Sequence, residues 1–339
     1  MTMQDRVTMQ DNEYLRSNNY FLEAEDLTMH FPAGKDALGR VNRWIHAADH
    51  VSFRIPKGKT LGVVGESGCG KSTVGRILMN LCKPTSGRVL YDGVDITALS
   101  DRDRRPYVKK MQLVWQDAYS SLDPRMRAEG IIGEGIRNFY PALSAPERSD
   151  RVMQLLQMCG LYPEHARFYP HQFSGGQRQR VCIARALATD PEFIVCDEAV
   201  SALDVSVQAQ IINLLKDLQD SLKLTYLFIS HDLNVVHFVA DEIIVMYLGE
   251  IVERGTMETV YNHRAHPYTS ALFSATPVFA PGEKKRDRIL LSGDPLSPVD
   301  PPAGCRFAGR CPYASDKCRE EPAWSEVEEN HFVKCHLFP

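Results

Sequence analysis

The spacing of apolar residues in the first quarter of the chain predicts strands followed by a helix. Residues 21–31 and 47–55 alternate apolar and polar side chains, which is typical of strands with one buried face. Residues 60–64 form a short apolar run of the kind found in buried strands, and residues 72–81 have helical spacing. Between the first two strands, residues 32–44 are rich in Gly, Lys, Arg and Asn and are expected to form a loop or an insertion.

The rest of the first 260 residues continues this alternation. Residues 88–92, 193–196 and 224–229 have the length and composition of short strands, and residues 128–161 are helical in pattern. An alternation of strands and helices predicts an α/β fold, in which helices cover a mostly parallel sheet.

Composition and charge limit the classes of function. Of the 339 residues, 44% are apolar and 24% are charged, and the formal net charge is -4, which argues against bulk attraction to nucleic acid or anionic lipid. The chain contains no apolar stretch near the roughly 18–20 residues that span a bilayer. Residues 1–20 are polar and lack the apolar core of a signal peptide. We therefore expect a cytosolic chain whose role at a membrane, if it has one, depends on a partner.

The character of the chain changes near residue 263. Six prolines fall within residues 277–302, so this segment is expected to be irregular, and residues 263–339 are expected to be a separate module with little apolar area of its own. Four of the nine cysteines lie in the last tenth of the chain, at Cys305, Cys311, Cys318 and Cys335. Thiolates gathered in a weakly cored segment can form a metal clip, because the energy of metal binding then contributes to folding.

A glycine-rich turn between a predicted strand and a predicted helix has the pattern G-x-x-x-x-G-K-[ST]. Its residues are Gly65, Glu66, Ser67, Gly68, Cys69, Gly70, Lys71, Ser72 and Thr73. The glycines let successive backbone N–H groups point into one concavity, and the helix start adds its positive dipole end, so the turn can hold phosphate. Lys71 would reach the β- and γ-phosphates, and the Ser72 hydroxyl would bind Mg²⁺. The pattern arises by chance in about one chain of this length per hundred, and it indicates a P-loop NTPase.

Two acidic residues follow the apolar strand 193–196. Carboxylates at the C-terminal end of a buried strand lie where an open α/β sheet binds ligands. We expect Asp197 to hold Mg²⁺ and Glu198 to orient or deprotonate the attacking water, a role worth about 10²–10⁴ in rate. An Asp-Glu pair in a solvated turn is the common alternative, and the four preceding apolar residues argue against it.

A second helix start with exposed N–H groups follows about a hundred residues after the first. Ser174 is expected to be the N-cap of a helix over residues 178–188, and Gly175 and Gly176 leave its first N–H groups accessible. One nucleotide does not readily explain two phosphate-binding sites in one chain. Two chains facing each other explain them, if each offers this helix start to the ATP that the other chain holds.

These motifs together resemble the ABC ATPases over nearly the whole chain. Besides the P-loop, the chain has the family's signature sequence at Ser174, Gly175, Gly176 and Gln177, a Q-loop glutamine at Gln116, a D-loop at Ser201–Asp204 and a switch histidine at His231. The resemblance implies a P-loop NTPase of RecA-like core with a β-subdomain over residues 21–262, into which a helical subdomain of about 125–185 is inserted. It also implies a head-to-tail dimer that closes on two ATP molecules.

The resemblance also assigns roles to single residues. It implies that ATP and Mg²⁺ are cofactors, with Ser72, Gln116 and Asp197 as magnesium ligands. His231 would contact the γ-phosphate, and Gln116 would sense Mg²⁺ and the attacking water. Asp204 of the D-loop would join the nucleotide site. An aromatic residue upstream of the P-loop would stack on adenine, and of the two candidates, Phe31 and Trp44, we select Phe31.

The end of the chain resembles one subfamily, the oligopeptide/dipeptide importer ATPases. The resemblance is carried by His266-Pro267-Tyr268-Thr269, by residues 120–126, and by the cysteine-rich tail at 263–339. It implies a [4Fe–4S] cluster bound by the four cysteines, whose wide spacing (C-x5-C-x6-C-x16-C) such clusters tolerate. Zinc, which prefers close C-x₂₋₄-C pairs, is the second interpretation and free thiols are the third. Disulfides are disfavoured in the cytosol.

The resulting hypothesis is a transport ATPase of the translocase class that powers import of short peptides. The resemblance implies partners as well: a sister ATPase subunit, two membrane permease subunits and an extracytoplasmic peptide-binding protein. The chain would sit at the cytoplasmic face of the cell membrane and dock on the permease through residues 120–127 and the helical region after them. An importer for glutathione, opines or nickel chelates is the alternative, and a soluble ABC ATPase acting on nucleic acid is a further one. The acidic net charge and the single cassette count against nucleic acid, and a P-loop kinase would have no use for the signature helix.

Overall fold

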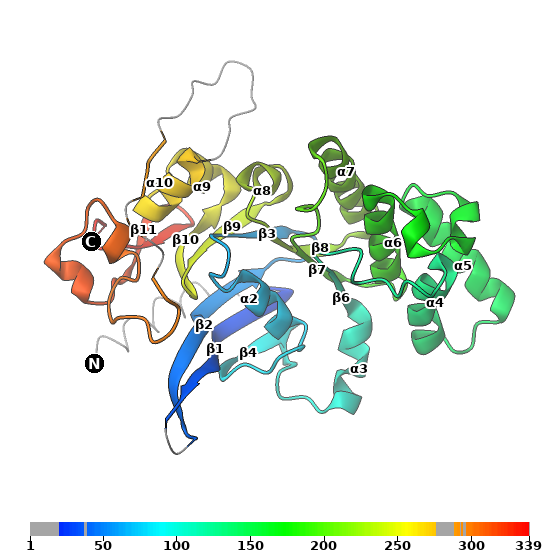
Figure 1. The fold of residues 1–339 in the computed structure, drawn as a ribbon, viewed down its shortest axis with the longest axis horizontal. Coiled ribbons are helices and arrows are strands. Elements are labelled where there is room, and N and C mark those ends of the chain that lie inside the picture. Colours follow the sequence, from blue (N-terminus) through cyan, green and yellow to red (C-terminus); the bar gives the residue numbers. More distant parts are fainter. Residues whose placement is uncertain (1–19, 37–38, 276–287, 292, 294–295, 339) are drawn as a thin grey trace. The chain divides into compact units, whose positions relative to one another are not determined.

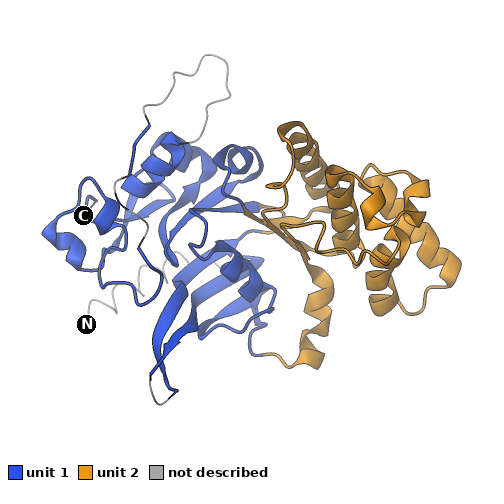
Figure 2. Ribbon diagram, viewed as in Figure 1, with its two compact units in different colours: residues 1–56, 60–98, 230–339 blue, residues 57–59, 99–229 orange. Residues whose placement is uncertain are grey.

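The structure, a computed structural model, is made of two compact units (Figures 1 and 2). Unit 1 consists of residues 1–56, 60–98 and 230–339, and unit 2 of residues 57–59 and 99–229. The structure describes residues 20–36, 39–275, 288–291, 293 and 296–338. The polar tail expected at 1–20 lies almost wholly outside the described residues, as do Pro277, Pro281 and Pro295.

The first sheet of unit 1 is antiparallel, with strand order β2-β1-β4-β5. Its strands are β1 (Leu22–Lys35), β2 (Val41–Ile55), β4 (Ser86–Tyr91) and β5 (Val94–Asp95). Strands β1 and β2 run side by side as long ribbons (Figure 1). Of the two alternatives expected for residues 32–44, a loop or an insertion, the loop is wrong for most of that segment, where Pro32 pairs with Trp44 and Lys35 with Val41.

Proline is tolerated here because this part of β1 has a partner on one edge. Strand β4 pairs with residues Leu22 to Thr28 of β1. Beyond Thr28, among the described residues, β1 pairs with β2 alone. A proline lacks an N–H group but removes no ladder hydrogen bond when that group would face the open edge. The glycine and charged residues that suggested a loop are thus accommodated in an extended hairpin.

The second sheet of unit 1 carries the P-loop. Its order is β11-β12-β10-β9-β3, and β3 runs parallel to β9 while the other neighbours are antiparallel. The strands are β3 (Thr60–Val64), β9 (Glu242–Tyr247), β10 (Glu250–Thr256), β11 (Trp324–Glu328) and β12 (His331–Lys334). The helices of unit 1 are α2 (Lys71–Leu78), α8 (Leu233–Val239), α9 (Met257–Asn262) and α10 (Pro267–Ser274), with 3₁₀ turns η3 (Ala308–Arg310) and η4 (Asp316–Arg319).

The two tail strands join this sheet through a buried polar pair. Strand β12 pairs with β10 at Val333 and Phe332. The side chains of His331 and Glu253 are both fully buried, and His331 Nε2 lies 2.7 Å from a Glu253 carboxylate oxygen. The same carboxylate accepts hydrogen bonds from the backbone N–H groups of Ala265 and His266, at 2.8 and 2.9 Å. A buried charge needs such partners, and here they tie β10, β12 and the start of α10 together.

Unit 2 contains three parallel strands and the inserted helices. The strands are β6 (Met111–Val114), β7 (Phe193–Asp197) and β8 (Thr225–Ile229), and β7 lies between the other two. The helices are α3 (Asp101–Lys110), α4 (Ala128–Phe139), α5 (Ala145–Met158), α6 (Gly175–Leu187) and α7 (Val205–Leu222), with 3₁₀ turns η1 (Pro163–Arg167) and η2 (Pro170–Gln172). The helical stretch expected at 128–161 is divided in two, because Pro141 ends the first part and Ser144 caps the second with a capping box.

Among the described residues, none of the helices combines the length and the apolar character that crossing a lipid bilayer requires.

Candidate nucleotide-binding site

The phosphate-binding turn of unit 1 lies between β3 and α2, as the sequence predicts. Gly65 and Gly70 have φ angles of 151° and 108°. A Cβ atom at Gly65 would lie 2.2 Å from the carbonyl oxygen of Met246, and one at Gly70 would lie 2.0 Å from that of Ala47. The turn therefore packs so closely on neighbouring backbone that only glycine fits at these two positions.

Lys71 is held against the turn. Its side chain is buried, and its ammonium donates hydrogen bonds to the carbonyl oxygens of Gly65 and Glu66 at 2.8 and 2.9 Å. Gly70, the N-cap of α2, supplies no side-chain acceptor to the first turn of the helix. A buried cation beside a helix start without a side-chain cap has the character of an anion site.

Two residues that the sequence analysis did not assign to the site hold Glu66. The backbone N–H of Glu66 donates to the hydroxyl of Tyr268 at 2.7 Å. The guanidinium of Arg310 donates to both carboxylate oxygens of Glu66, at 2.8 and 3.1 Å. Tyr268 stands in the His-Pro-Tyr-Thr motif and Arg310 directly precedes Cys311, but nothing in their local pattern points to a glycine-rich turn more than 200 positions away.

His231 also belongs to unit 1, where it lies two positions before α8, next to the N-cap Asp232. Its side chain is exposed, and the neighbouring Asp232 caps the helix by accepting a hydrogen bond from the Asn234 N–H at 2.9 Å. The histidine thus lies in a turn fixed by a cap. Its contact with a γ-phosphate stays a prediction.

Unit 2 brings Gln116 and Glu198 together. Asp197 ends β7 and is buried, and Glu198 follows with a φ of 48°. The Gln116 side-chain amide donates to a Glu198 carboxylate oxygen at 2.7 Å. A left-handed conformation is unusual for a residue other than glycine, and such strain often occurs at functional sites. The pair and its strain support the predicted role of Glu198 in handling water.

The signature segment begins helix α6 with a capping box. The Ser174 hydroxyl accepts from the Gln177 N–H at 3.3 Å, and the Ser174 N–H donates to the Gln177 side chain at 3.0 Å. Ser174 is therefore the N-cap, as predicted. Asp204 of the D-loop is likewise the N-cap of α7. A Cβ atom at Gly175 would lie 3.4 Å from Leu203 of the D-loop, so the two segments are neighbours.

The predicted site residues are thus divided between the units. Unit 1 contains Phe31, residues 65–73 and His231, and unit 2 contains Gln116, residues 174–177, Asp197, Glu198 and Asp204. The predicted magnesium ligands Ser72, Gln116 and Asp197 come from both units, and their assembly around one ion stays a prediction.

Known proteins share much of this sequence. It matches the family described as ABC transporter over residues 48–201. It is 51% identical to the putative oligopeptide transport ATP-binding protein YkfD of Bacillus subtilis, over 94% of this chain and 95% of the relative. The chain belongs to the ABC transporter family. It is 45% identical to the dipeptide transport ATP-binding protein DppF of Haemophilus influenzae and 44% identical to the oligopeptide transport ATP-binding protein OppF of Salmonella typhimurium, over 95% and 96% of this chain and 98% of each relative.

Solved structures agree with this ABC ATPase fold. A dimeric structure of MJ0796, a bacterial ABC transporter cassette, is 32% identical and covers 70% of this chain and 98% of its own, with a TM-score of 0.62. The predicted fold class, a P-loop NTPase with the helical insertion of ABC ATPases, is confirmed. Family membership makes the chain an ATPase with ATP and Mg²⁺ as cofactors.

The aromatic candidates for adenine lie on the β1–β2 hairpin of this ABC ATPase. Phe31 pairs with Ile45, and Pro32 pairs with Trp44. Directly paired residues share a face and successive residues alternate, so Phe31 and Trp44 lie on opposite faces of the ribbon. Both are partly exposed, at 37% and 40%. At most one of the two rings can therefore stack on a given adenine.

Residues 252–318 of this ABC ATPase match a second family, described as the C-terminal region of oligopeptide/dipeptide transporters. Cys305, Cys311, Cys318 and Cys335 line one cavity of about 30 Å³. Burial raises the pKa of Cys305 to about 11, and burial also raises the pKa of Cys311 and Cys335.

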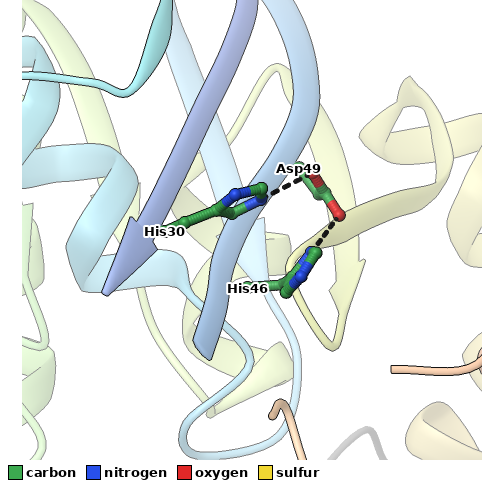
Figure 3. Close-up of side chains that lie close together, drawn as sticks. All are labelled: His30, His46 and Asp49. Carbon is green, nitrogen blue, oxygen red and sulfur yellow. Dashed lines mark hydrogen bonds and ion pairs between the residues drawn. The ribbon is translucent and has the colours of Figure 1, made fainter. Parts of the chain in front are cut away.

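A separate polar cluster links the hairpin to the cysteine-rich tail. His30 lies within hydrogen-bond distance of one carboxylate oxygen of Asp49, at 3.1 Å, and His46 of the other, at 2.7 Å (Figure 3). Their spacing would fit a metal ion, but the buried Arg306 guanidinium also donates to Asp49. Burial raises the pKa of Asp49, yet hydrogen bonds from His46, Arg306 and His30 outweigh it and hold this pKa well below its usual range. Because a dication would lie beside a guanidinium, we interpret the cluster as a structural anchor.

Proposed function

We propose that this ABC ATPase is the ATP-hydrolysing subunit of an importer of short peptides. The observation that carries the proposal is the union of two features in one chain. One is a complete set of ATP-hydrolysis motifs, in which Gln116 contacts Glu198 at 2.7 Å. The other is a C-terminal region of the oligopeptide/dipeptide transporter type at residues 252–318. The peptide-transport names of the relatives support the same cargo class.

The roles of the site residues belong to this proposal. The turn 65–73 binds the phosphates, with Lys71 at the β- and γ-phosphates, and Phe31 stacks on adenine. Ser72, Gln116 and Asp197 bind Mg²⁺, Glu198 activates water, and His231 contacts the γ-phosphate. Residues 174–177 and Asp204 complete the site of the facing ATPase chain. The helix-start geometry of α2 and of α6 supports both phosphate contacts.

The chain would act at the cytoplasmic face of the membrane, bound to two permease subunits and paired with a sister ATPase. Within residues 120–127, which follow Gln116, the side chains of Ser120, Pro124, Arg125 and Arg127 are exposed, so this segment is placed to contact a permease loop. The carbonyl of Ser121 in this segment accepts a hydrogen bond from Arg185 of α6. A docking segment that contacts the signature helix can pass the state of one to the other, which supports coupling between transport and ATP. An extracytoplasmic binding protein would deliver the peptide.

The cysteine site is proposed to hold a [4Fe–4S] cluster. Its fit rests on four thiols that line one cavity. In tetrahedral zinc sites the sulfur atoms lie about 3.8 Å apart, as follows from a Zn–S distance of about 2.3 Å. Within the described chain, the group of side chains with single-ion spacing is that of His30, His46 and Asp49. In the described residues the four cysteines do not form a group with that spacing, which favours the larger cluster over zinc. When bound, a cluster would supply iron–thiolate bonds that fix the tail.

The cluster proposal is tested by composition. Anaerobically purified protein is expected to contain iron and acid-labile sulfide and to absorb visible light, and Cys318→Ser is expected to lose all three signals. A content of one zinc per chain without acid-labile sulfide would show that the site binds zinc and not a [4Fe–4S] cluster.

Peptide import is tested by uptake in the native cell. Deletion of the gene is expected to abolish uptake of labelled di- and oligopeptides, and the wild-type gene is expected to restore it while Glu198→Gln does not. Uptake of glutathione, opines or chelated nickel, measured in the same strains, would reassign the cargo if one of these were lost in place of peptides. Co-purification with RNA rather than with membrane proteins would reassign the class.

A further inference from the structure

The phosphate-binding turn is held from outside by the cysteine-rich tail. Arg310 and Glu66 form a two-pronged ion pair across 244 positions of sequence, with N–O distances of 2.8 and 3.1 Å. The Arg310 side chain is 9% exposed and that of Glu66 is 31% exposed. Hydrogen bonding to Glu66 raises the pKa of Arg310, so the guanidinium stays charged. A paired, largely buried guanidinium of this geometry is both strong and directional.

Glu66 is fixed at three points. Its side chain is held by Arg310, its N–H is donated to Tyr268, and its carbonyl accepts from Lys71. Since the Glu66 N–H is already used, the N–H groups that bind phosphate must come from later in the turn. The orientation of the peptide planes on either side of Glu66 decides where those later groups point. A turn held in its binding conformation loses less conformational entropy when phosphate arrives.

The arginine is delivered by a short loop between two of the cysteines. Within residues 305–311, Phe307 is buried against the rings of Tyr247 and Tyr268, at 5.3 and 5.5 Å between centroids. Arg306 donates to Asp49 and contacts Glu250. The backbone N–H groups of Ala308 and Arg310 donate hydrogen bonds of 3.0 Å to the carbonyl oxygens of Cys305 and Phe307. The loop therefore presents Arg310 from a fixed position.

We propose that Arg310 is a positioning residue for ATP binding, which acts from the tail through Glu66 to hold the phosphate-binding turn. The proposal rests on the ATP-binding function of the chain. It gives the tail a role in the nucleotide site, because the ion pair between Arg310 and Glu66 joins the loop 305–311 to the phosphate-binding turn. A ligand that orders the cysteines is therefore expected to order the turn as well.

The test compares ATP affinity among purified full-length variants, with a fluorescent ATP analogue and Mg²⁺. Arg310→Ala is expected to raise the Kd about tenfold or more, the range for a lost charge-assisted hydrogen bond. Arg310→Lys keeps the charge but loses the two-pronged hydrogen bonding, so its Kd is expected to lie between those of the wild type and Arg310→Ala. Arg319→Ala is the matched control, because Arg319 lies in the same tail, is 84% exposed and pairs with Asp316. It is expected to bind like the wild type.

A double-mutant cycle separates positioning from general stability. Glu66→Gln is expected to weaken binding about as much as Arg310→Ala, and the double variant is expected to be no weaker than either. In steady-state turnover of the assembled transporter, KM for ATP is expected to rise while kcat changes less than about twofold. If Arg310→Ala does not fold, Arg310→Lys with Glu66→Gln completes the same cycle.

The outcomes are distinct. An unchanged Kd in folded Arg310→Ala, or fully additive effects in the cycle, would overturn the role of Arg310. Failure of the wild-type chain to bind ATP at all would contradict the proposed function instead.

Discussion

At the scale of single residues, Glu198 combines two features expected of a group that handles water. It is held in a left-handed backbone conformation with φ of 48°, and its carboxylate accepts a hydrogen bond from the Gln116 amide at 2.7 Å. Its N–H donates to the carbonyl of Ile229, which fixes the strained turn after β7. The strain is thus maintained by neighbours, which keep the carboxylate in one orientation.

Glu198→Gln is expected to leave ATP binding intact and to lower turnover by about 10²–10⁴, because an amide of the same size cannot take a proton from water. The checks are ATP affinity and phosphate release in the assembled transporter, where the variant is expected to accumulate a closed, ATP-bound dimer. Glu192→Gln is the control. Glu192 lies just before the same strand and pairs with Lys57 and Lys110, and turnover is expected to be unaffected. Unchanged turnover in Glu198→Gln would remove the assignment of the base.

Phe31 and Trp44 offer a second comparison between single residues, since they are similarly exposed but lie on opposite faces of the hairpin. Phe31→Ala is expected to weaken ATP binding by about two- to tenfold, the range for one aromatic stacking contact, whereas Trp44→Ala is expected to have no effect. GTP competition measured with the same variants shows whether the lost contact is to the base. The reverse ranking would move adenine to Trp44.

At the scale of elements, the local sequence pattern predicted the helices, strands and turns whose formation depends on neighbouring residues. Strand β3, the turn after it, the N-cap Ser174 and strand β7 are all specified by short runs of residues, and all were found where expected. The hairpin through Pro32 was missed because a strand tolerates proline where the missing N–H group would face an open edge. Which edge of β1 is open depends on strand pairing, and the local pattern does not show it. The tail strands were missed for the same kind of reason. Strand β12 is joined to β10 by His331 and Glu253, which lie 78 positions apart.

The buried Glu253 should therefore matter for the stability of the tail strands. Glu253→Gln keeps the size of the side chain but sets amide hydrogens against N–H groups, and it removes charge-assisted hydrogen bonds from Ala265, His266 and His331. We expect the free energy of unfolding to fall by about 2–4 kcal/mol, measured by denaturant titration. Glu326→Gln, on the more exposed strand β11, is the control and is expected to change it little. Equal free energies of unfolding for the wild type and Glu253→Gln would show that the Glu253–His331 pair makes no net contribution to stability.

At the scale of the whole molecule, the sequence predicts the parts of the ATP site but not how the tail supports it. Lys71, Asp197 and Ser174 are recognisable because each belongs to a motif with its own chemistry. The contact between Arg310 and Glu66 has no such signature, since an arginine before a cysteine is compatible with any exposed position. Only the folded chain places that guanidinium on the turn.

Helix α6 is predicted to contact an ATP molecule that is held by a facing chain. Among the residues that the structure describes, a Cβ atom at Gly175 would come within 4 Å of Leu203 alone, at 3.4 Å, so the start of α6 has room for a side chain to begin there. An acidic side chain in the first turn of a helix favours that helix, so Gly175→Asp is expected to fold at least as well as the wild type. The same carboxylate would repel a phosphate group at the helix start.

Gly175→Asp should then abolish ATP hydrolysis by the complex with the sister ATPase, the permease and Mg²⁺, while the isolated chain still binds ATP through its own turn. Gly175→Asn, of equal size and without charge, separates repulsion from bulk and is expected to retain most of the activity if charge is decisive. Phosphate release by the reconstituted complex and ATP affinity of the single chain are the two measurements. Hydrolysis by Gly175→Asp at the wild-type rate would mean that α6 meets no phosphate, and the ATP site would then have to be complete within one chain.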